Sequence, residues 1–246
     1  MGWSLTEDGE VLTELIVTQE YNVYPIFKEV GSGLAFTLSA DGTYYICSGF
    51  GTNRSTNLVI PAGYNGLPVL EIAENAFLGG KSTGSGNLGQ PMYYIPQSVT
   101  IINGVQKIGN GAFSGCEGLT TVKIPSSVKY LGSEVFYNYR YTPLIHVEIR
   151  GSLTYAGDYA FGYQDNMDVL RDNAAQQDGS GGYYLGYTAK NGDFVENYLL
   201  DISDNYTSIT VNVNTDIIGS GACVGNDNLQ SITLNKYLKH ICGDAF

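Results

Sequence analysis

The chain has 246 residues, of which 43% are hydrophobic, and its 12 basic and 24 acidic residues give a formal net charge of −12. This length and apolar content are sufficient for a buried core. The acidic balance argues against a nucleic-acid or anionic-membrane partner, because such partners require clusters of Lys and Arg. The sequence contains no run of about 18 apolar residues, so no membrane insertion is expected.

The N-terminal segments differ from the rest of the chain. Residues 1–33 are predicted to form a cap-like strand region, because the apolar spacing that begins at Leu12 suits one strand and the first unit of a repeat array must cover an open apolar end. Residues 34–57 alternate apolar and polar side chains on both sides of Asp41-Gly42. An Asp-Gly pair in this setting predicts a β-hairpin, here one that leads into the repeats.

Residues 58–246 contain an apolar framework that recurs at a spacing of about 23 residues. In its clearest copy, the apolar residues that precede Phe136 are Leu119, Val122, Ile124, Val128 and Leu131. The same offsets occur, with few departures, before Phe113, Phe161, Cys223 and Phe246. Self-similarity at this period predicts a solenoid, because one unit cannot bury its own apolar face and must stack on its copies.

The spacing inside one copy predicts its local structure. Apolar residues two apart, such as Val122 and Ile124, indicate a short strand with one face inward. A second apolar pair follows, and then Gly-x-x-Ala/Val-Phe, in which Gly132 is expected to permit a tight bend and the next residues to form one helical turn. The predicted fold is a β-rich solenoid of right-handed coils of about 23 residues. Residues expected in inward rows are Val122, Val147, Ile209 and Ile232, and Phe113, Phe136 and Phe161.

Two insertions interrupt the rhythm of the repeats. The Gly- and Ser-rich residues 79–91 are expected to form a mobile loop. Residues 162–200 are rich in Tyr, Asp and Gly, and insertions in solenoids map to loops on one face, often the binding face. Removing this second insertion is expected to leave the solenoid folded, because the repeat register resumes at Tyr206.

Three stretches combine the spacing with recurring residue types: LTTVKIPSSVKYLGSEVFYN at 119–138, GNGAFSGC at 109–116 and LVIPAGYNGLPVLEIAENAF at 58–77. Together they resemble the BspA-like class of bacterial leucine-rich repeat, and the third is similar to the usual first repeat of that family. The resemblance implies a leucine-rich-repeat fold over residues 58–246 outside the insertions. It also implies a surface or secreted protein used in adhesion and partner binding.

The four cysteines are predicted to be free and buried. The repeat register places Cys223 at the inward aromatic position and Cys242 at the Gly position. No C-x-x-C pair suggests a zinc site. The acidic stretches do not match the twelve-residue calcium-loop pattern, so solvated carboxylates are the default, and neither a metal nor a cofactor is predicted. The two histidines, His146 and His240, are far apart in sequence, and no catalytic residue is predicted.

Candidate binding residues come from two groups. Tyrosine accounts for 20 of the 246 residues, and its apolar ring with a hydrogen-bonding tip suits recognition of proteins and sugars. The first group lies near the aromatic position of two adjacent repeats or in the second insertion: Tyr137, Tyr139, Tyr141, Tyr155, Tyr159, Tyr163, Tyr183, Tyr184 and Tyr187. Its first six members are expected to stack, either as a ligand surface or as a stabilising ladder. The second group consists of outward strand residues: Lys123, His146 and Glu148.

These features predict a non-enzymatic recognition or adhesion scaffold that binds a protein or polysaccharide at a bacterial cell surface or after secretion, because large shallow surfaces suit such partners. Residues 1–10 lack the features of a signal peptide. A virion component, such as a phage fibre or decoration protein, is therefore the alternative. A hydrolase housed in the second insertion rests only on clustered Asp residues. The core position of Phe246 predicts that further repeats or a neighbouring chain cover this end.

Overall fold

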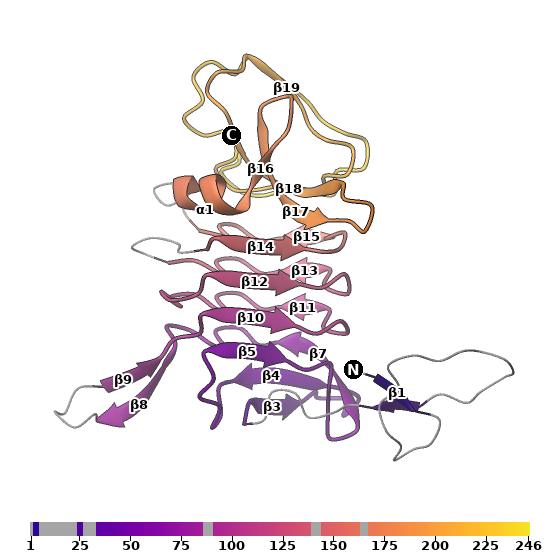
Figure 1. Ribbon diagram of the computed structural model, residues 1–246, viewed down its shortest axis with the longest axis vertical. Helices are drawn as coiled ribbons and strands as arrows, with labels where there is room; N and C mark the ends of the chain where they lie inside the picture. The colour runs from indigo at the N-terminus through magenta and orange to yellow at the C-terminus, as the bar shows by residue number, and fades with distance from the viewer. Residues whose placement is uncertain (1, 5–23, 27–32, 86–90, 139–143, 163–166) are drawn as a thin grey trace, which may run out of the picture.

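The computed structural model describes residues 2–4, 24–26, 33–85, 91–138, 144–162 and 167–246. These residues form 22 strands and one helix, and most strands stack across the long axis of the molecule (Figure 1). β1 (Gly2–Ser4) and β2 (Tyr24–Ile26) pair antiparallel. The strand predicted around Leu12 lies outside the described residues.

A hairpin precedes the repeats. β3 (Ala35–Leu38) and β4 (Tyr45–Gly49) pair antiparallel. The Asp41 carboxylate closes the turn between them by accepting hydrogen bonds from Ser39 and Thr43, which lower the pKa of Asp41. β4 then pairs in parallel with β7 (Leu67–Ile72) and so connects the hairpin to the repeats.

A first parallel ladder runs along the stack through the leading strand of each repeat. Its members are β5 (Asn57–Ile60), β10 (Ser98–Ile101), β12 (Thr121–Ile124) and β14 (His146–Ile149). The register aligns Val99, Val122 and Val147, all of which are buried. The inward row predicted from the period-two spacing is therefore confirmed for these repeats.

A second parallel ladder runs through the short strand that follows in each repeat. It contains β7, β11 (Lys107–Ile108), β13 (Tyr130–Leu131) and β15 (Tyr155–Ala156), and β6 (Gly63–Tyr64) pairs antiparallel with β7. In the interior, successive ring centroids are 4.9, 5.5 and 5.5 Å apart along the row of Phe77, Phe113, Phe136 and Phe161. All four rings are buried, so the predicted row of core phenylalanines is confirmed.

The segment after each second-ladder strand is a run of tight turns and not the predicted helical turn. The residue two positions before the core aromatic has a positive φ in successive repeats, of 58° at Gly111, 54° at Glu134 and 55° at Tyr159. This left-handed conformation cannot continue a right-handed helix. The chain therefore reverses here by turns alone.

Gly132 and Gly157 serve close packing between repeats and not the tight bend predicted for them. A Cβ atom on Gly132 would lie 2.6 Å from the backbone nitrogen of Asn110, and one on Gly157 would lie 2.4 Å from that of Ser133. These distances are far shorter than a favourable contact between heavy atoms. Only glycine therefore allows the neighbouring backbones to approach this closely.

Gly132→Ala is expected to lower the free energy of unfolding by about 1–3 kcal/mol, because the added methyl group must push two repeats apart. Gly179→Ala is the matched control, since a Cβ atom there meets nothing within 4 Å. Urea denaturation of the two variants measures the difference. Equal stabilities would contradict the close approach of the backbones at Gly132.

Residues 79–91 do not form the loop predicted for them. β8 (Lys81–Ser85) and β9 (Pro91–Tyr94) pair as an antiparallel hairpin, which projects from the stack in Figure 1. Residues 86–90 between the two strands lie outside the described residues.

Residues 162–200 also differ from the predicted loop, because they continue the sheet. They include α1 (Met167–Ala174), β16 (Gln176–Gln177), β17 (Gly182–Thr188) and most of β18 (Phe194–Ile202). β16 and β18 both pair antiparallel with β17. β17 pairs in parallel with β14, and β18 pairs in parallel with β20 (Ile217–Ile218). We call residues 167–202 the bridging segment, since they join the first ladder to the C-terminal repeats.

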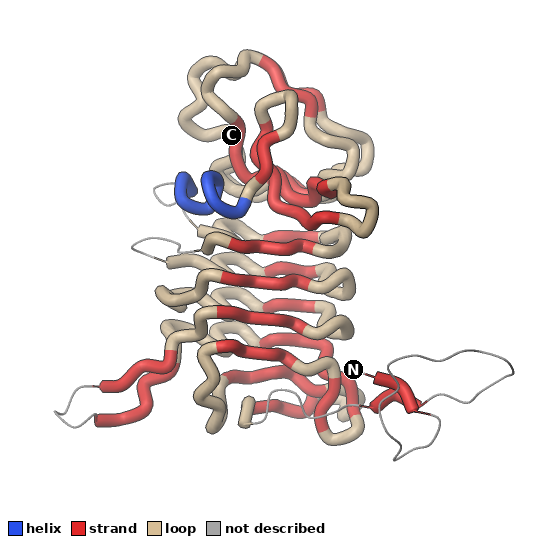
Figure 2. Tube along the Cα trace, viewed as in Figure 1, coloured by secondary structure: helices blue, strands red, loops and turns tan. Residues whose placement is uncertain are grey.

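The two C-terminal repeats are oriented differently from the first stack (Figure 2). β19 (Ser208–Thr210) and β21 (Ser231–Thr233) form a separate two-stranded ladder. β20 and β22 (His240–Ile241) extend the sheet that contains β14, β17 and β18. Ile209 and Ile232 are therefore aligned with each other but belong to a different ladder from Val122 and Val147.

The last repeat contacts the second ladder of the first stack. The ring of His240 lies 4.5 Å from that of Tyr155, and the Cys242 thiol donates a hydrogen bond to the Ala156 carbonyl at 3.3 Å. The C-terminal repeats are thus held both by the bridging segment and by direct contacts with the stack.

All four cysteines are free and buried. Burial raises the pKa of Cys47, Cys116 and Cys223 to about 12 and that of Cys242 to about 11. The reactive thiolate is therefore scarce in the folded protein at neutral pH. We expect iodoacetamide at pH 8 to leave the native protein unmodified and to modify all four thiols after unfolding without reductant, as read by intact mass. A mass lower by two hydrogens per cysteine pair would contradict the free thiols.

Candidate functional site

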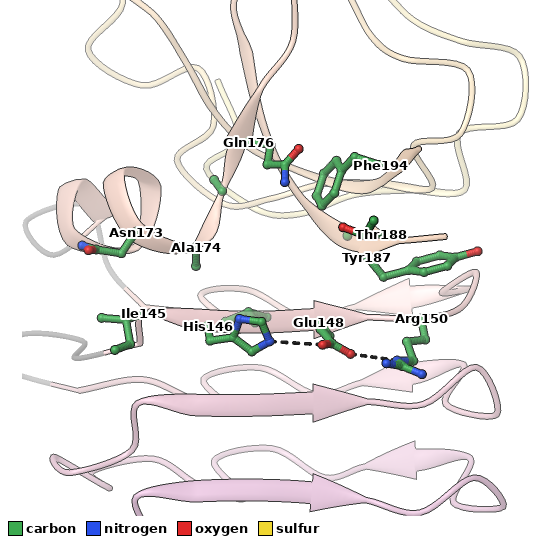
Figure 3. A pocket seen from close by; sticks show the side chains of 13 residues that line it. Ile145, His146, Glu148, Arg150, Asn173, Ala174, Gln176, Tyr187, Thr188 and Phe194 are labelled. Atoms are coloured by element: carbon green, nitrogen blue, oxygen red, sulfur yellow. Dashed lines mark hydrogen bonds and ion pairs between the residues drawn. The ribbon is translucent and has the colours of Figure 1, made fainter. Parts of the chain in front are cut away.

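A hollow opens where β14 meets β17, because these strands share a single register pair, Glu148 with Gly186. The hollow has a volume of about 230 Å³ and lies between β14 and the β17–β18 hairpin, with the end of α1 at one side (Figure 3). Gly186 allows the hairpin strands to approach, since a Cβ atom there would lie 1.8 Å from the Val195 carbonyl oxygen. The first ladder therefore forms one wall and the bridging segment the other.

The β14 wall carries a charged row. Parallel pairing puts Lys123 next to Glu148, and period-two alternation puts His146 and Arg150 on the same face. The Glu148 carboxylate lies 3.1 Å from His146 Nε2, 2.8 Å from Arg150 Nε and 3.9 Å from Lys123 Nζ. Desolvation raises the pKa of Glu148, but the hydrogen bonds and the positive charges of these neighbours outweigh it and lower the pKa overall. The carboxylate is therefore held in its ionised form.

The opposite wall is aromatic. Tyr187 and Phe194 come from the facing ends of β17 and β18, and both are half-buried. In Figure 3 the Phe194 ring lies across the hollow from His146 and Glu148, whereas the Tyr187 ring extends past Arg150. The hollow therefore places an aromatic ring across from a row of hydrogen-bonding groups.

A larger hollow of about 550 Å³ adjoins the first, since Arg150 and Tyr187 line both. Its far side is formed by the C-terminal repeats. There the Asp216 carboxylate accepts a hydrogen bond from Ser152 Oγ at 3.2 Å and lies 2.8 Å from Lys239 Nζ, and Lys239 also donates to Ser152. We call the two hollows together the cleft.

Asn197 ties the walls of the cleft together. Its side-chain amide donates hydrogen bonds to the carbonyls of Ile149 at 2.6 Å and Gly151 at 3.2 Å. Asn197 is buried, so these bonds satisfy a polar group that would otherwise cost free energy. They fix β18 against the end of β14.

Four predicted binding residues lie at the cleft. His146, Glu148 and Tyr187 line it, and Lys123 is paired with Glu148. The repeat spacing alone predicts that the outward residues of the first ladder lie together. Tyr187 lies near them because β17 pairs with β14, which the repeat spacing does not predict.

The prediction of Tyr184 as a surface residue is wrong. Its side chain is fully buried, its hydroxyl accepts a hydrogen bond from the Asn212 backbone N–H at 3.3 Å, and burial raises its pKa. Bulges in β17 break the simple alternation of faces. The neighbouring Tyr183 contacts α1, where the guanidinium of Arg171 lies 5.4 Å from the ring centroid.

The other predicted tyrosines lie on different parts of the stack. Tyr155 is stacked between Tyr130 and His240 on the second ladder, with centroid distances of 4.6 and 4.5 Å. The Tyr159 hydroxyl is hydrogen-bonded to the Asp244 carboxylate. This arrangement favours the stabilising ladder over the contiguous ligand surface for Tyr155. The remaining members are the half-buried Tyr137 and, outside the described residues, Tyr139, Tyr141 and Tyr163.

Several residues of the cleft are not among those predicted from the sequence, among them Arg150, Phe194, Asp216 and Lys239. Arg150 continues the outward alternation of β14 and could have been found from that pattern. The others come from the bridging segment and the C-terminal repeats. Lys239 meets Ser152 across 87 residues of sequence, and no local pattern indicates that contact.

Among the residues that the structure describes, no group of three or more His, Cys, Asp or Glu side chains is placed to hold a metal ion. The described part of the chain also contains no helix with the length and apolar character needed to cross a membrane.

No curated protein matches this chain significantly. Among solved structures, the leucine-rich repeat protein TpLRR of T. pallidum is 18% identical, with 87% of this chain and 86% of that chain covered and a TM-score of 0.46. The pneumococcal vaccine antigen PcpA is 16% identical, with 87% and 67% covered and a TM-score of 0.39. A leucine-rich cell surface protein from Faecalibacterium prausnitzii is 18% identical, with 91% and 74% covered and a TM-score of 0.26.

A protein-family model also matches the chain. Six copies of the BspA type leucine-rich repeat region match residues 92–172 and 190–246, which are more than half of the chain. Taken with the parallel ladders and the stacked phenylalanines, this match shows that the chain belongs to the BspA type leucine-rich repeat family.

Proposed function

We propose that this chain is a non-enzymatic recognition or adhesion scaffold that binds a protein or polysaccharide partner at a bacterial cell surface or after secretion. The scaffold is a right-handed solenoid of coils of about 23 residues, to which the bridging segment adds a wall. The cleft carries the proposal, because it forms where the generic repeats meet the segment that departs from them. Concave sites with a few convergent polar groups are the usual places for ligands.

The charges in the cleft favour binding over catalysis. Glu148 is engaged by Arg150 and His146, and Asp216 by Lys239. A general acid at neutral pH needs a carboxyl group with a raised pKa, whereas the pKa of Glu148 is lowered. Side chains held by such pairs can orient a ligand through hydrogen bonds without taking part in proton transfer.

The outward face of the first ladder supports a partner larger than a small molecule. It extends from the cleft as a shallow polar surface made by the strand residues Ser98, Thr100, Thr121 and Lys123. Protein and polysaccharide partners bind over such extended surfaces, whereas small molecules require enclosure.

The test measures binding of fluorescently labelled protein to intact bacterial and epithelial cells by flow cytometry. The double variant Arg150→Ala/Tyr187→Ala is expected to bind at least tenfold more weakly than the unchanged protein. Arg54→Ala/Tyr130→Ala removes the same residue types outside the cleft and is expected to bind normally. Circular dichroism verifies that both variants fold. Undiminished binding by the cleft variant, or no cell binding by the unchanged protein, would overturn the proposal.

A further inference from the structure

We infer that the cleft binds a neutral oligosaccharide, with one sugar ring in the smaller hollow and the following rings in the larger one. This inference rests on the proposed function and adds the chemical class of the ligand. It is carried by the shape of the cleft, by its two unlike walls and by the pairing of its charges.

The shape of the cleft suits a chain of ring-sized units. The smaller hollow, at about 230 Å³, is below the roughly 300–1,000 Å³ that is typical for drug-sized ligands. The larger hollow, at about 550 Å³, can take more than one such unit. Arg150 and Tyr187 line both hollows and therefore lie where a linkage between two units would pass.

The unlike walls match the two kinds of surface on a sugar ring. A pyranose has a face of C–H groups and a rim of hydroxyl groups. The Phe194 ring in the smaller hollow and the Tyr187 ring where the two hollows meet can each cover the C–H face of one unit, since aromatic side chains bury much apolar area. Across the hollow, Glu148 accepts hydrogen bonds, and Arg150, whose Nε is used by Glu148, retains its Nη groups as donors. Hydroxyl groups both donate and accept and can satisfy this mixed set.

The pairing of charges selects a neutral ligand. Glu148 is paired with Arg150 and Asp216 with Lys239, and Lys123 lies farther from Glu148, at 3.9 Å. A carboxylated sugar would have to displace these pairs and would enter a chain of net charge −12. Breaking the Asp216–Lys239 pair would leave the carboxylate of Asp216, whose side chain is only 9% exposed, without its partner, which is costly. Neutral hydroxyls can bond to the same groups while the pairs remain intact.

A peptide fits the cleft less well. Extended peptides commonly bind by adding a strand to a free sheet edge. Here the edge of β14 is occupied at two points, because Gly186 of β17 pairs with Glu148 and the Asn197 amide donates a hydrogen bond to the Ile149 carbonyl. A peptide would therefore have to bind without the main-chain hydrogen bonds that usually supply its affinity.

The test uses saturation-transfer difference NMR and titration of the full chain with neutral tetrasaccharides of glucose, mannose and galactose, and with a tetrasaccharide of galacturonic acid as the charged counterpart. At least one neutral tetrasaccharide is expected to bind, and more tightly than the charged one. Tyr187→Ala and Arg150→Ala are each expected to raise the Kd at least tenfold. Tyr187→Phe is expected to keep the Kd within about threefold of that of the unchanged protein, because it retains the ring that covers the sugar. A tenfold change in Kd corresponds to about 1.4 kcal/mol. Tyr130→Ala and Arg54→Ala are the matched controls and should leave the Kd unchanged.

Three results would overturn the inference: no binding of any neutral tetrasaccharide, preference for the charged one, or a Kd that Tyr187→Ala leaves unchanged. The cell-binding experiment separates this failure from that of the proposed function. If sugars do not bind but Arg150→Ala/Tyr187→Ala still abolishes cell binding, the cleft recognises a protein and the recognition role stands. If neither assay responds to the cleft variants, both proposals fail.

Discussion

Phe136→Ala is expected to lower the free energy of unfolding by about 3–5 kcal/mol. The Phe136 ring is only 1% exposed and stacks between Phe113 and Phe161 at centroid distances of 5.5 Å on each side. Its removal leaves a cavity that the neighbouring rings, held by their own repeats, can fill only in part. Urea denaturation followed by circular dichroism measures the loss.

Phe246→Ala is the matched control for this truncation. Phe246 occupies the same repeat position but is 60% exposed. The same chemical change is therefore expected to cost less than about 1 kcal/mol, as for other exposed side chains. Equal losses at Phe136 and Phe246 would show that the stacked row does not stabilise the fold.

The stacked repeats could be predicted because their signals are local. Val122 and Ile124 are two residues apart, and this alternation determines which face of β12 is buried without reference to the rest of the chain. Repetition at about 23 residues then implies the parallel register, which the structure has between Val99 and Val122.

The turn geometry could not be predicted, because the residue at the left-handed position differs in type from one repeat to the next. Gly111 occupies the left-handed position in one repeat, but Glu134 and Tyr159 occupy it in the next two. The backbone conformation there is imposed by stacking, since the N–H of Glu134 donates to the Asp158 carbonyl in the adjacent repeat. The conformational preferences of Glu and Tyr alone would have disfavoured a positive φ at these positions.

The cleft could be predicted only in part because its second wall depends on strand pairing over long distances. The break in spacing predicts an insertion at residues 162–200, and its composition suggests a loop. β17 and β18 are instead largely buried, and bulges within β17 decide that Tyr184 is inside while Tyr187 lines the cleft. A register shift of one residue exchanges the faces of a strand, so composition cannot distinguish these two tyrosines.

Excision of residues 162–200 with a short Gly-Ser bridge is expected to unfold the C-terminal repeats, contrary to the expectation from sequence. The excision removes β17 and most of β18, including the side chains Leu170, Tyr184, Leu185, Tyr198, Leu199 and Leu200, all at most 2% exposed. Each large-to-small change at such a site costs about 2–5 kcal/mol. Their combined loss is as large as the roughly 5–15 kcal/mol that stabilises a typical domain.

The first stack is expected to survive this excision, since each repeat contacts mainly its neighbours. Hydrogen exchange should therefore show unprotected amides in residues 203–246 and protected amides from residue 98 to about residue 136. Excision of residues 82–93, which removes most of the projecting β8–β9 hairpin, is the matched control and should leave both regions protected.

Continued protection of residues 203–246 after excision of the bridging segment would mean that the C-terminal repeats can stack directly on β14 and β15. The contacts in the structure argue against that outcome. β19 and β21 form their own ladder, away from β14, and β20 is held in the sheet by β18. The direct contacts with the stack are side-chain contacts, among them those of His240 with Tyr155, Cys242 with Ala156, Asp244 with Tyr159 and Asp216 with Ser152. Without the bridging segment, these side-chain contacts would have to hold a pair of repeats whose inward row, at Ile209 and Ile232, no longer faces a partner.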